Sequence, residues 1–269
     1  MDPLSQRERS LAMTLLPFTF FPLNAIVGKM LHKVFVFLLN VCFPPRCQAC
    51  RSILPFSNTA SVCEPCVSRI RWIEPPHCVA CGRSLGVLGI CPACPRGGEK
   101  FHFDRALACA AFEGPVREML HRYKFNRKTV LKSFLTQRLL EFASKNLKKE
   151  DFDAVLAVPL DPAGHDSRGF NQSRVLSDAL GKKMALKDLS SALGRKKSLS
   201  HQSLLAKTAR KTNVRGAFFL KDKTAFRRFK RVLLVDDILT SGQTLSECAK
   251  TLKESGAQSV TALAFARAL

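Results

Sequence analysis

The C-terminal two thirds of the chain alternate between short apolar runs and longer stretches with apolar residues at helical spacing. Four runs have the length and composition of buried strands, at residues 106–112, 154–158, 232–235 and 260–265. The stretches between them that are predicted to form helices cover residues 116–123, 129–147, about 171–182 and 244–256. Strands joined through helices indicate a parallel sheet with right-handed crossovers. The pattern therefore predicts an α/β domain.

Two adjacent carboxylates, Asp236 and Asp237, directly follow the apolar run 232–235. In open α/β sheets, ligands bind at the carboxyl ends of the strands. The next residues are small or hydroxylated and lead into a predicted helix, so their N–H groups could hold a phosphate. Two acids beside a phosphate site would repel the anion unless they bind ribose hydroxyls or a hydrated Mg²⁺.

This stretch resembles the phosphoribosyl-pyrophosphate (PRPP) motif of type I phosphoribosyltransferases. The resemblance implies that Asp236 and Asp237 face the ribose hydroxyls, and that a loop wraps the 5′-phosphate. The loop consists of Thr240, Ser241, Gly242, Gln243 and Thr244, with Ser241 where threonine is usual. The alternative is an ordinary buried strand followed by a capped helix. The spacing matches neither a Walker loop nor a Rossmann glycine motif.

A second loop follows the predicted strand 154–158 and fits the pyrophosphate-binding loop of the same enzymes. It contains Pro159, Leu160 and Asp161, and Arg168 comes shortly afterwards. The planar guanidinium of Arg168 suits phosphate oxygens, although this side chain could instead only order the loop. Transfer of phosphoribose also requires Mg²⁺ to neutralise the pyrophosphate.

The formal charge of +22 favours anionic partners: nucleic acid, phosphorylated substrates or an anionic membrane. The charge is concentrated, since residues 195–231 hold thirteen Lys or Arg and one acid. The part 195–215, with Gln202 and Arg210, corresponds to the flexible lid that closes over PRPP in such enzymes. The alternative is a solvated linker.

Eight of the eleven cysteines form C-x-x-C pairs, which suit tetrahedral Zn²⁺ held by thiolates. The pairs predict one or two structural zinc sites in two short ribbons, with sequential pairing the simplest and an interleaved pairing open. A disulfide framework is the alternative. Trp72, between the ribbons, either packs them together or stacks on a base. The cysteines are Cys47, Cys50, Cys63, Cys66, Cys78, Cys81, Cys91 and Cys94.

The sequences Val-Pro-Leu at 158–160 and Arg-Gly-Phe-Asn-Gln-Ser at 168–173, together with the C-x-x-C pairs, resemble the competence protein F (ComF) family. The resemblance covers about residues 31–267. It implies a double zinc ribbon followed by a type I phosphoribosyltransferase domain. It also implies a cytoplasmic role in natural transformation, with single-stranded DNA, a competence helicase and a recombination mediator as partners. Ala163 and Gly164 depart from the family, which tends to be basic there.

These observations predict three regions: an apolar extension at 1–43, a double zinc ribbon at 44–96 and a phosphoribosyltransferase domain at 101–269. The extension could associate peripherally with a membrane through residues 11–43, carry a signal peptide, or be bypassed by a start at Met30.

Two functions fit the sequence. The first is Mg²⁺-dependent binding of PRPP, with transfer of phosphoribose to an acceptor. The second is non-catalytic binding of single-stranded DNA, or an assembly role, on the same fold. The sequence indicates no clear general base, since the candidates are so by residue type alone: His121, His165, His201, Lys124 and Lys207.

Overall fold

The protein is described from a computed structural model that defines residues 41–55, 61–87, 89–92, 94, 101–125, 130–160, 170–196 and 214–268. The chain divides into two compact units, residues 1–45 and 46–269, and the second carries the sheet and both cysteine-rich ribbons. No described helix is long and apolar enough to cross a membrane. Residues 11–40 of the apolar extension lie outside the described part.

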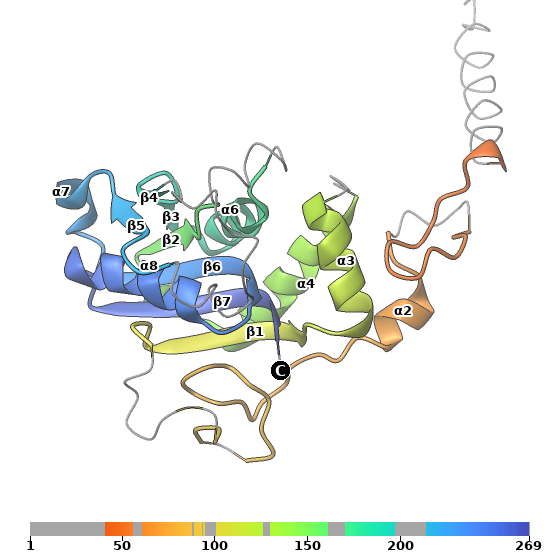
Figure 1. Ribbon diagram of the computed structural model, residues 1–269, viewed down its shortest axis with the longest axis horizontal. Coiled ribbons are helices and arrows are strands. Elements are labelled where there is room, and N and C mark those ends of the chain that lie inside the picture. Colours follow the sequence, from red (N-terminus) through yellow and green to blue (C-terminus); the bar gives the residue numbers. More distant parts are fainter. Residues whose placement is uncertain are drawn as a thin grey trace, which may run out of the picture. The chain divides into compact units, whose positions relative to one another are not determined.

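A five-stranded sheet, in the order β1-β7-β6-β2-β3, forms the centre of the second unit (Figure 1). Every neighbouring pair is parallel, as predicted. The central strands are buried along most of their length because both faces of the sheet are covered. The strands are β1 Arg105–Ala111, β2 Ala154–Ala157, β3 Lys187–Asp188, β6 Arg231–Leu239 and β7 Ser259–Arg267.

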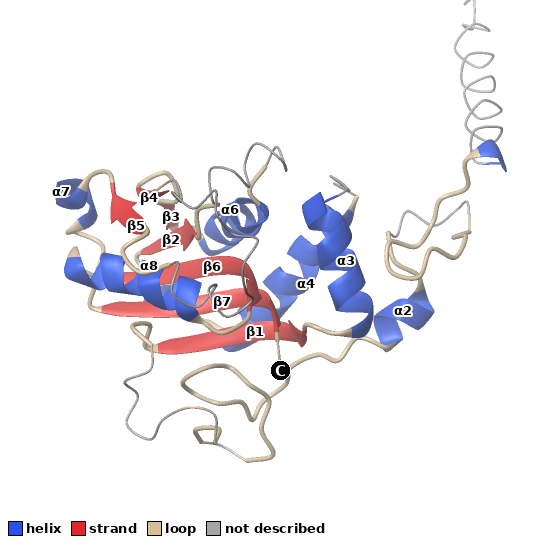
Figure 2. Cartoon of the chain, viewed as in Figure 1, coloured by secondary structure: helices blue, strands red, loops and turns tan. Residues whose placement is uncertain are grey.

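Helices cover the two faces separately (Figure 2). On one face lie α3 Gly114–Phe125, α4 Leu131–Asn146 and α6 Gln172–Met184, which pack against side chains such as Leu233 and Phe265. On the other face α8, Gln243–Glu254, buries Leu245, Cys248 and Leu252. The short elements are α2 Glu64–Ser68, η1 Lys149–Asp151, β4 Leu193–Arg195, β5 Phe218–Leu220 and α7 Lys223–Phe226.

Strand β6 is longer than the predicted run 232–235, and this changes the place of the acid pair. Pairing with β7 continues past the apolar residues, with Asp236 opposite Ala264 and Leu239 opposite Arg267. The carboxylates therefore belong to the strand itself rather than to the loop after it. A rigid, hydrogen-bonded backbone fixes their positions.

The prediction that residues 195–215 form a loop throughout is wrong at its first residue. Arg195 ends β4, which pairs antiparallel with β5 in a separate two-stranded sheet. Gly194 permits this pairing, because a methyl group there would come within 2.6 Å of the Phe219 ring. This small sheet flanks the basic segment 197–213, which lies outside the described residues.

The cysteine-rich region is attached to the edge strand β1. The amide of Ile73 donates to the carbonyl of Cys109 at 2.8 Å, and Trp72 forms an antiparallel bridge with Ala110. We call the part from Cys47 to Cys66 the first ribbon and the part from Cys78 to Cys94 the second. Trp72 is half-buried and packs against a core cluster shared by β1 and the first ribbon. Gly82, in the second ribbon, has a φ of 68°, and a methyl group there would lie 2.6 Å from the carbonyl oxygen of Ala106.

Candidate functional site

A cavity of about 400 Å³ lies at the carboxyl ends of β2 and β6. This is the edge of an open α/β sheet where ligands bind. The lining brings together the acid pair and loop of β6, the loop after β2, the first turn of α6, the last turn of α3 and the end of β4. The residues are Lys124, Val158, Pro159, Leu160, Ser173, Arg195, Asp236, Asp237, Ile238, Thr240 and Thr244.

Asp236 is held by two hydrogen bonds to its Oδ1 atom. The Ser173 hydroxyl donates at 2.8 Å from the first turn of α6, and the Asp237 amide donates at 2.8 Å. The pKa of the Asp236 carboxyl is raised well above its usual range. The main cause is burial away from water, and the second is the negative charge of Asp237. Its ionised form is therefore costly, and a ligand that donates hydrogen bonds to this carboxylate would relieve the cost.

This raised pKa predicts that Asp236→Asn stabilises the fold at neutral pH. Between about pH 4 and the raised pKa, the folded chain binds more protons at Asp236 than the unfolded chain, so stability falls as pH rises. The amide keeps an Oδ1 acceptor and carries no charge. We expect a gain of about 1 to 2 kcal/mol at pH 8, or a few degrees in Tm, which disappears near pH 4. Thermal unfolding across this pH range measures it, and a gain that is equal at pH 4 and pH 8 would contradict the titration.

Asp237 forms an ion pair with Lys124, whose Nζ lies 2.9 Å from Asp237 Oδ2. The two side chains are 9% and 20% exposed, so the pair is largely shielded from water. Lys124 comes from the last turn of α3, far from β6 in the sequence. The sequence indicated Lys124 only as a candidate base by residue type, and the structure instead pairs it with Asp237. Lys124 supplies the positive charge that allows two carboxylates to stand side by side.

Removal of this cation is expected to destabilise the site. Lys124→Met leaves Asp237 unpaired beside Asp236, and we expect a loss of about 2 to 3 kcal/mol of unfolding free energy at pH 8. Addition of Asp237→Asn to that variant removes the unpaired charge and should restore most of the loss. Urea unfolding of both variants measures this difference. If Lys124→Met alone is as stable as the wild type, Lys124 does not neutralise the charge of Asp237.

The predicted phosphate loop connects β6 to α8. Gly242 is the N-cap of α8 and has a φ of 81°, in the left-handed region that favours glycine. The amides in the first turn of a helix have no carbonyl partner within it. Together with the hydroxyls of Thr240 and Thr244 on the cavity wall, these amides suit an anion at the positive end of the helix dipole.

The other predicted site residues divide into two groups. Pro159 and Leu160 line the cavity, whereas Asp161, Arg168, Gln202 and Arg210 lie outside the described residues. Arg195 lines the cavity from β4, although the sequence indicated it only as the start of the basic stretch. Among the histidines considered as bases, His121 is exposed and not part of the lining, while His165 and His201 lie outside the described residues.

The eight cysteines form two clusters, each made by consecutive pairs. Cys47, Cys50, Cys63 and Cys66 form the first, and Cys78, Cys81, Cys91 and Cys94 the second. Within each cluster the sulfurs lie within 4.8 Å of one another. The pairing is sequential, as the simpler prediction had it, and the interleaved alternative is wrong.

The geometry of both clusters fits zinc. Four thiolates at about 2.3 Å from a tetrahedral ion stand about 3.8 Å apart. The sulfurs of Cys50 and Cys63, and those of Cys81 and Cys91, are 3.7 Å apart. Backbone amides donate to the sulfurs of Cys47 and Cys78 at 3.3 Å. Four protein ligands leave no open position, so such ions would be structural rather than catalytic.

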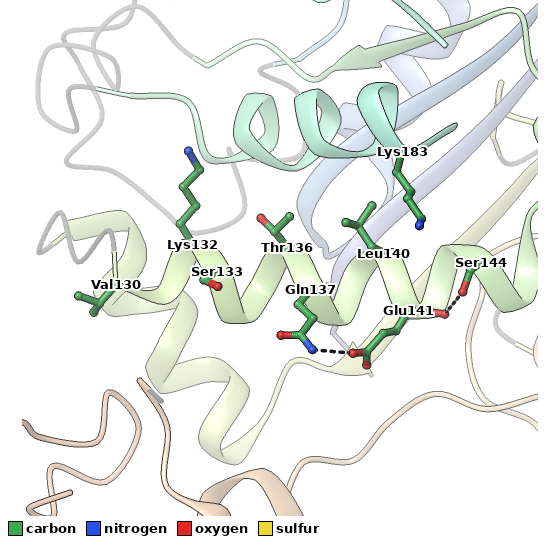
Figure 3. A pocket seen from close by; sticks show the side chains of 9 residues that line it. All are labelled: Val130, Lys132, Ser133, Thr136, Gln137, Leu140, Glu141, Ser144 and Lys183. Carbon is green, nitrogen blue, oxygen red and sulfur yellow. Dashed lines mark hydrogen bonds between the residues drawn. The ribbon is translucent and has the colours of Figure 1, made fainter. Parts of the chain in front are cut away.

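A larger hollow of about 700 Å³ runs along α4, with Lys183 of α6 above it (Figure 3). Gln137 donates to the Glu141 carboxylate, and Ser144 donates to the Glu141 carbonyl, so these polar groups satisfy one another. None of the predicted ligand-binding residues lines this hollow. The cavity at the acid pair is therefore the candidate site.

Comparison with known proteins gives two matching family models. The double zinc ribbon domain matches residues 38–95, and the phosphoribosyl transferase domain matches residues 139–268. The first range contains all eight clustered cysteines, and the second contains the acid pair and the predicted phosphate loop. Both predicted modules are thus confirmed, in the predicted order.

Curated relatives match across most of the chain. Competence protein F of Haemophilus influenzae is 28% identical over 83% of this chain and 97% of its own length. The DNA utilization protein YhgH of Escherichia coli O6:H1 is 28% identical over 84% of this chain and 98% of its own. Competence protein ComFC of Streptococcus pneumoniae is 26% identical over 82% and 97%. With both ribbons and the phosphoribosyl transferase domain in place, this chain is similar along most of its length to competence protein F (ComF) proteins.

Proposed function

We propose that this protein binds PRPP with Mg²⁺ in the cavity at the end of β6 and acts in the uptake or use of DNA. The observation that carries the proposal is the convergence of the acid pair, the loop hydroxyls and the two cations Lys124 and Arg195 on one cavity of about 400 Å³. PRPP needs each of these groups: acceptors for its ribose hydroxyls, amides for its 5′-phosphate and positive charge for its pyrophosphate.

Each group has a distinct part in this proposal. Asp236 and Asp237 accept hydrogen bonds from the two ribose hydroxyls, and the loop from Thr240 to Thr244 holds the 5′-phosphate. Because Lys124 offsets one carboxylate, the anionic ligand meets less repulsion than two free acids would cause. Mg²⁺, carried with PRPP, would neutralise the pyrophosphate.

The proposed biological setting rests on the names of the relatives. Two are called competence proteins, and a third is called a DNA utilization protein. Their matches span nearly their whole length, so the comparison includes the ribbons as well as the domain with the proposed ligand cavity. The charge of +22 suits a protein that works beside nucleic acid. We therefore place PRPP binding in a cytoplasmic protein that serves DNA uptake, with competence proteins as its partners.

A second candidate function is non-catalytic binding of single-stranded DNA or assembly with other proteins. The charge distribution favours it, since residues 195–231 contain thirteen Lys or Arg. Phosphate contacts by these side chains would make binding fall steeply with salt. Aromatic stacking, which single-strand binding proteins commonly use, has less support, because 20 of the 22 aromatic residues are phenylalanine and several are buried in the core.

One experiment separates the two candidates. Wild type, Asp236→Asn and a charge-depleted Lys196→Gln/Lys197→Gln variant are each titrated with Mg-PRPP and with a labelled single strand. Mg-PRPP binding that weakens about tenfold or more in Asp236→Asn, with DNA binding unchanged there, supports the acid pair as a ribose site. DNA binding that weakens with salt and in the charge-depleted variant, without any response to PRPP, would favour the second function instead.

A further inference from the structure

An aromatic side chain, Phe101, lies between the second ribbon and the phosphate loop. Phe101, which follows the ribbon, packs against the cluster Cys78, Cys81, Cys91 and Cys94. The same ring lies against Gly242, the glycine of the phosphate loop: a methyl group there would come within 2.7 Å of Phe101 Cε1. One side chain thus touches both the cysteine cluster and the predicted anion site.

Two further contacts hold the segment around Phe101 against the α8 side of the sheet. Its ring stacks on Phe103 with centroids 4.6 Å apart and an interplanar angle of 14°. Phe103 is buried in the core on the α8 side of the sheet. The amide of His102 donates to the Ser246 hydroxyl at 2.9 Å, which ties this segment to the first turns of α8. The segment 101–103 therefore borders the loop from the ribbon side.

The cysteine cluster itself is among the most buried parts of the chain. Cys78, Cys81 and Cys91 are each at most 1% exposed. Among the described residues, few apolar side chains accompany them: those packed on this cluster are Ala80, Leu85 and Phe101. The position of Phe101 on this side consequently depends on whether the four sulfurs are held together.

We infer that zinc in the second ribbon holds the phosphate loop in position through Phe101, so that zinc and a phosphate ligand stabilise each other's sites. The part of this inference that concerns the ligand rests on the proposed function, whereas the effect of zinc on the loop does not. A zinc-held cluster fixes Phe101, Phe101 fixes the backbone around Gly242, and the loop amides stay in place for an anion. Coupling of this kind is reciprocal, so bound ligand should also retain zinc.

The first ribbon provides an internal comparison. It contacts a different part of the domain, where the Arg122 guanidinium on α3 donates to the carbonyl of Gln48 at 2.8 Å. Phe101 does not belong to its core cluster. Loss of zinc from the first ribbon should therefore leave the phosphate loop unchanged, although the number of ions lost is the same.

The test is hydrogen exchange of the backbone amides in residues 240–246, measured without ligand. The variants are Phe101→Ala, Cys91→Ser/Cys94→Ser for the second ribbon, and Cys47→Ser/Cys50→Ser for the first. Phe229→Ala is the matched control, because Phe229 is a half-buried phenylalanine on the same side of the sheet that packs on Phe226. Zinc content and exchange in β6 and β7 show which variants keep their fold.

We expect exchange of the loop amides to quicken about tenfold in Phe101→Ala and in the second-ribbon variant, and to stay near wild type in both controls. Mg-PRPP should slow zinc release from the second ribbon in wild type but not in Phe101→Ala. Unchanged loop exchange in Phe101→Ala, or an equal rise in the first-ribbon variant, overturns the inference. If loop exchange responds as expected but the protein does not bind Mg-PRPP, the effect of zinc on the loop is supported and the proposed function is refuted.

Discussion

Removal of zinc from both ribbons is expected to unfold residues 46–94 while much of the sheet persists. Among the described residues of this range, six cysteines are buried together with five other apolar side chains, which include Leu54, Val62 and Ile70. So small a core cannot offset the conformational entropy of about fifty residues. Structural zinc in comparable peptides contributes apparent binding free energies of about 10 to 16 kcal/mol near pH 7. No other expected effect in this protein is as large.

Metal analysis combined with limited proteolysis measures this effect. The purified protein should contain two zinc ions per chain, and chelation should open the ribbons to protease before the sheet. Ribbons that remain protease-resistant without metal would contradict the zinc assignment. They would instead favour the disulfide alternative, in which paired sulfurs lie about 2.05 Å apart. The observed separations of 3.7 Å between Cys50 and Cys63, and between Cys81 and Cys91, suit a shared metal.

The second large effect is expected at the acid pair. Hydrogen bonds to charged groups contribute about 1.5 to 3 kcal/mol each, so loss of both carboxylates should weaken Mg-PRPP binding by about 3 to 6 kcal/mol. This corresponds to a loss of affinity on the order of 100-fold or more. Asp236→Asn/Asp237→Asn retains the size of both side chains and the acceptor for Ser173. Equilibrium binding measures the loss.

The control for this variant must account for Lys124, which the double substitution leaves without its carboxylate. Adding Lys124→Met to the two asparagines removes the unpaired cation and should restore stability without restoring affinity. A triple variant that regains both would show that the double variant bound poorly because its fold was damaged. Affinity that falls less than about threefold in the folded double variant would remove the acid pair from the binding site.

Much of the site could be predicted from sequence because its central motif is local. The apolar run, the two acids and the loop to Thr244 occupy consecutive positions, so their order alone indicates the edge of a sheet. The alternation of strands and helices likewise predicted the parallel sheet. The end of β6 was placed too early, because the continued pairing of Asp236 and Leu239 with β7 is a tertiary interaction that a run of apolar residues does not encode.

The positions of Lys124 and Arg195 in the cavity wall could not be predicted from the sequence for a related reason. Lys124 reaches Asp237 from α3, more than a hundred positions earlier in the chain, and no local pattern marks that pairing. Arg195 enters the cavity wall because β4 pairs with β5 across the basic segment. The contact of Phe101 with Gly242 is of the same kind. The grouping of the cysteines was easier to predict from the sequence, because the short gaps between consecutive pairs favour closure of each ribbon on itself.

A calorimetric titration of Mg-PRPP into the zinc-loaded protein and into Asp236→Asn/Asp237→Asn asks directly whether the acid pair binds PRPP. We expect saturable binding at one site per chain in the wild type, dependent on Mg²⁺, and loss of that binding in the variant. PRPP binding at the acid pair is refuted if the wild type gives neither heat nor thermal stabilisation at high PRPP, or if the folded variant binds equally well.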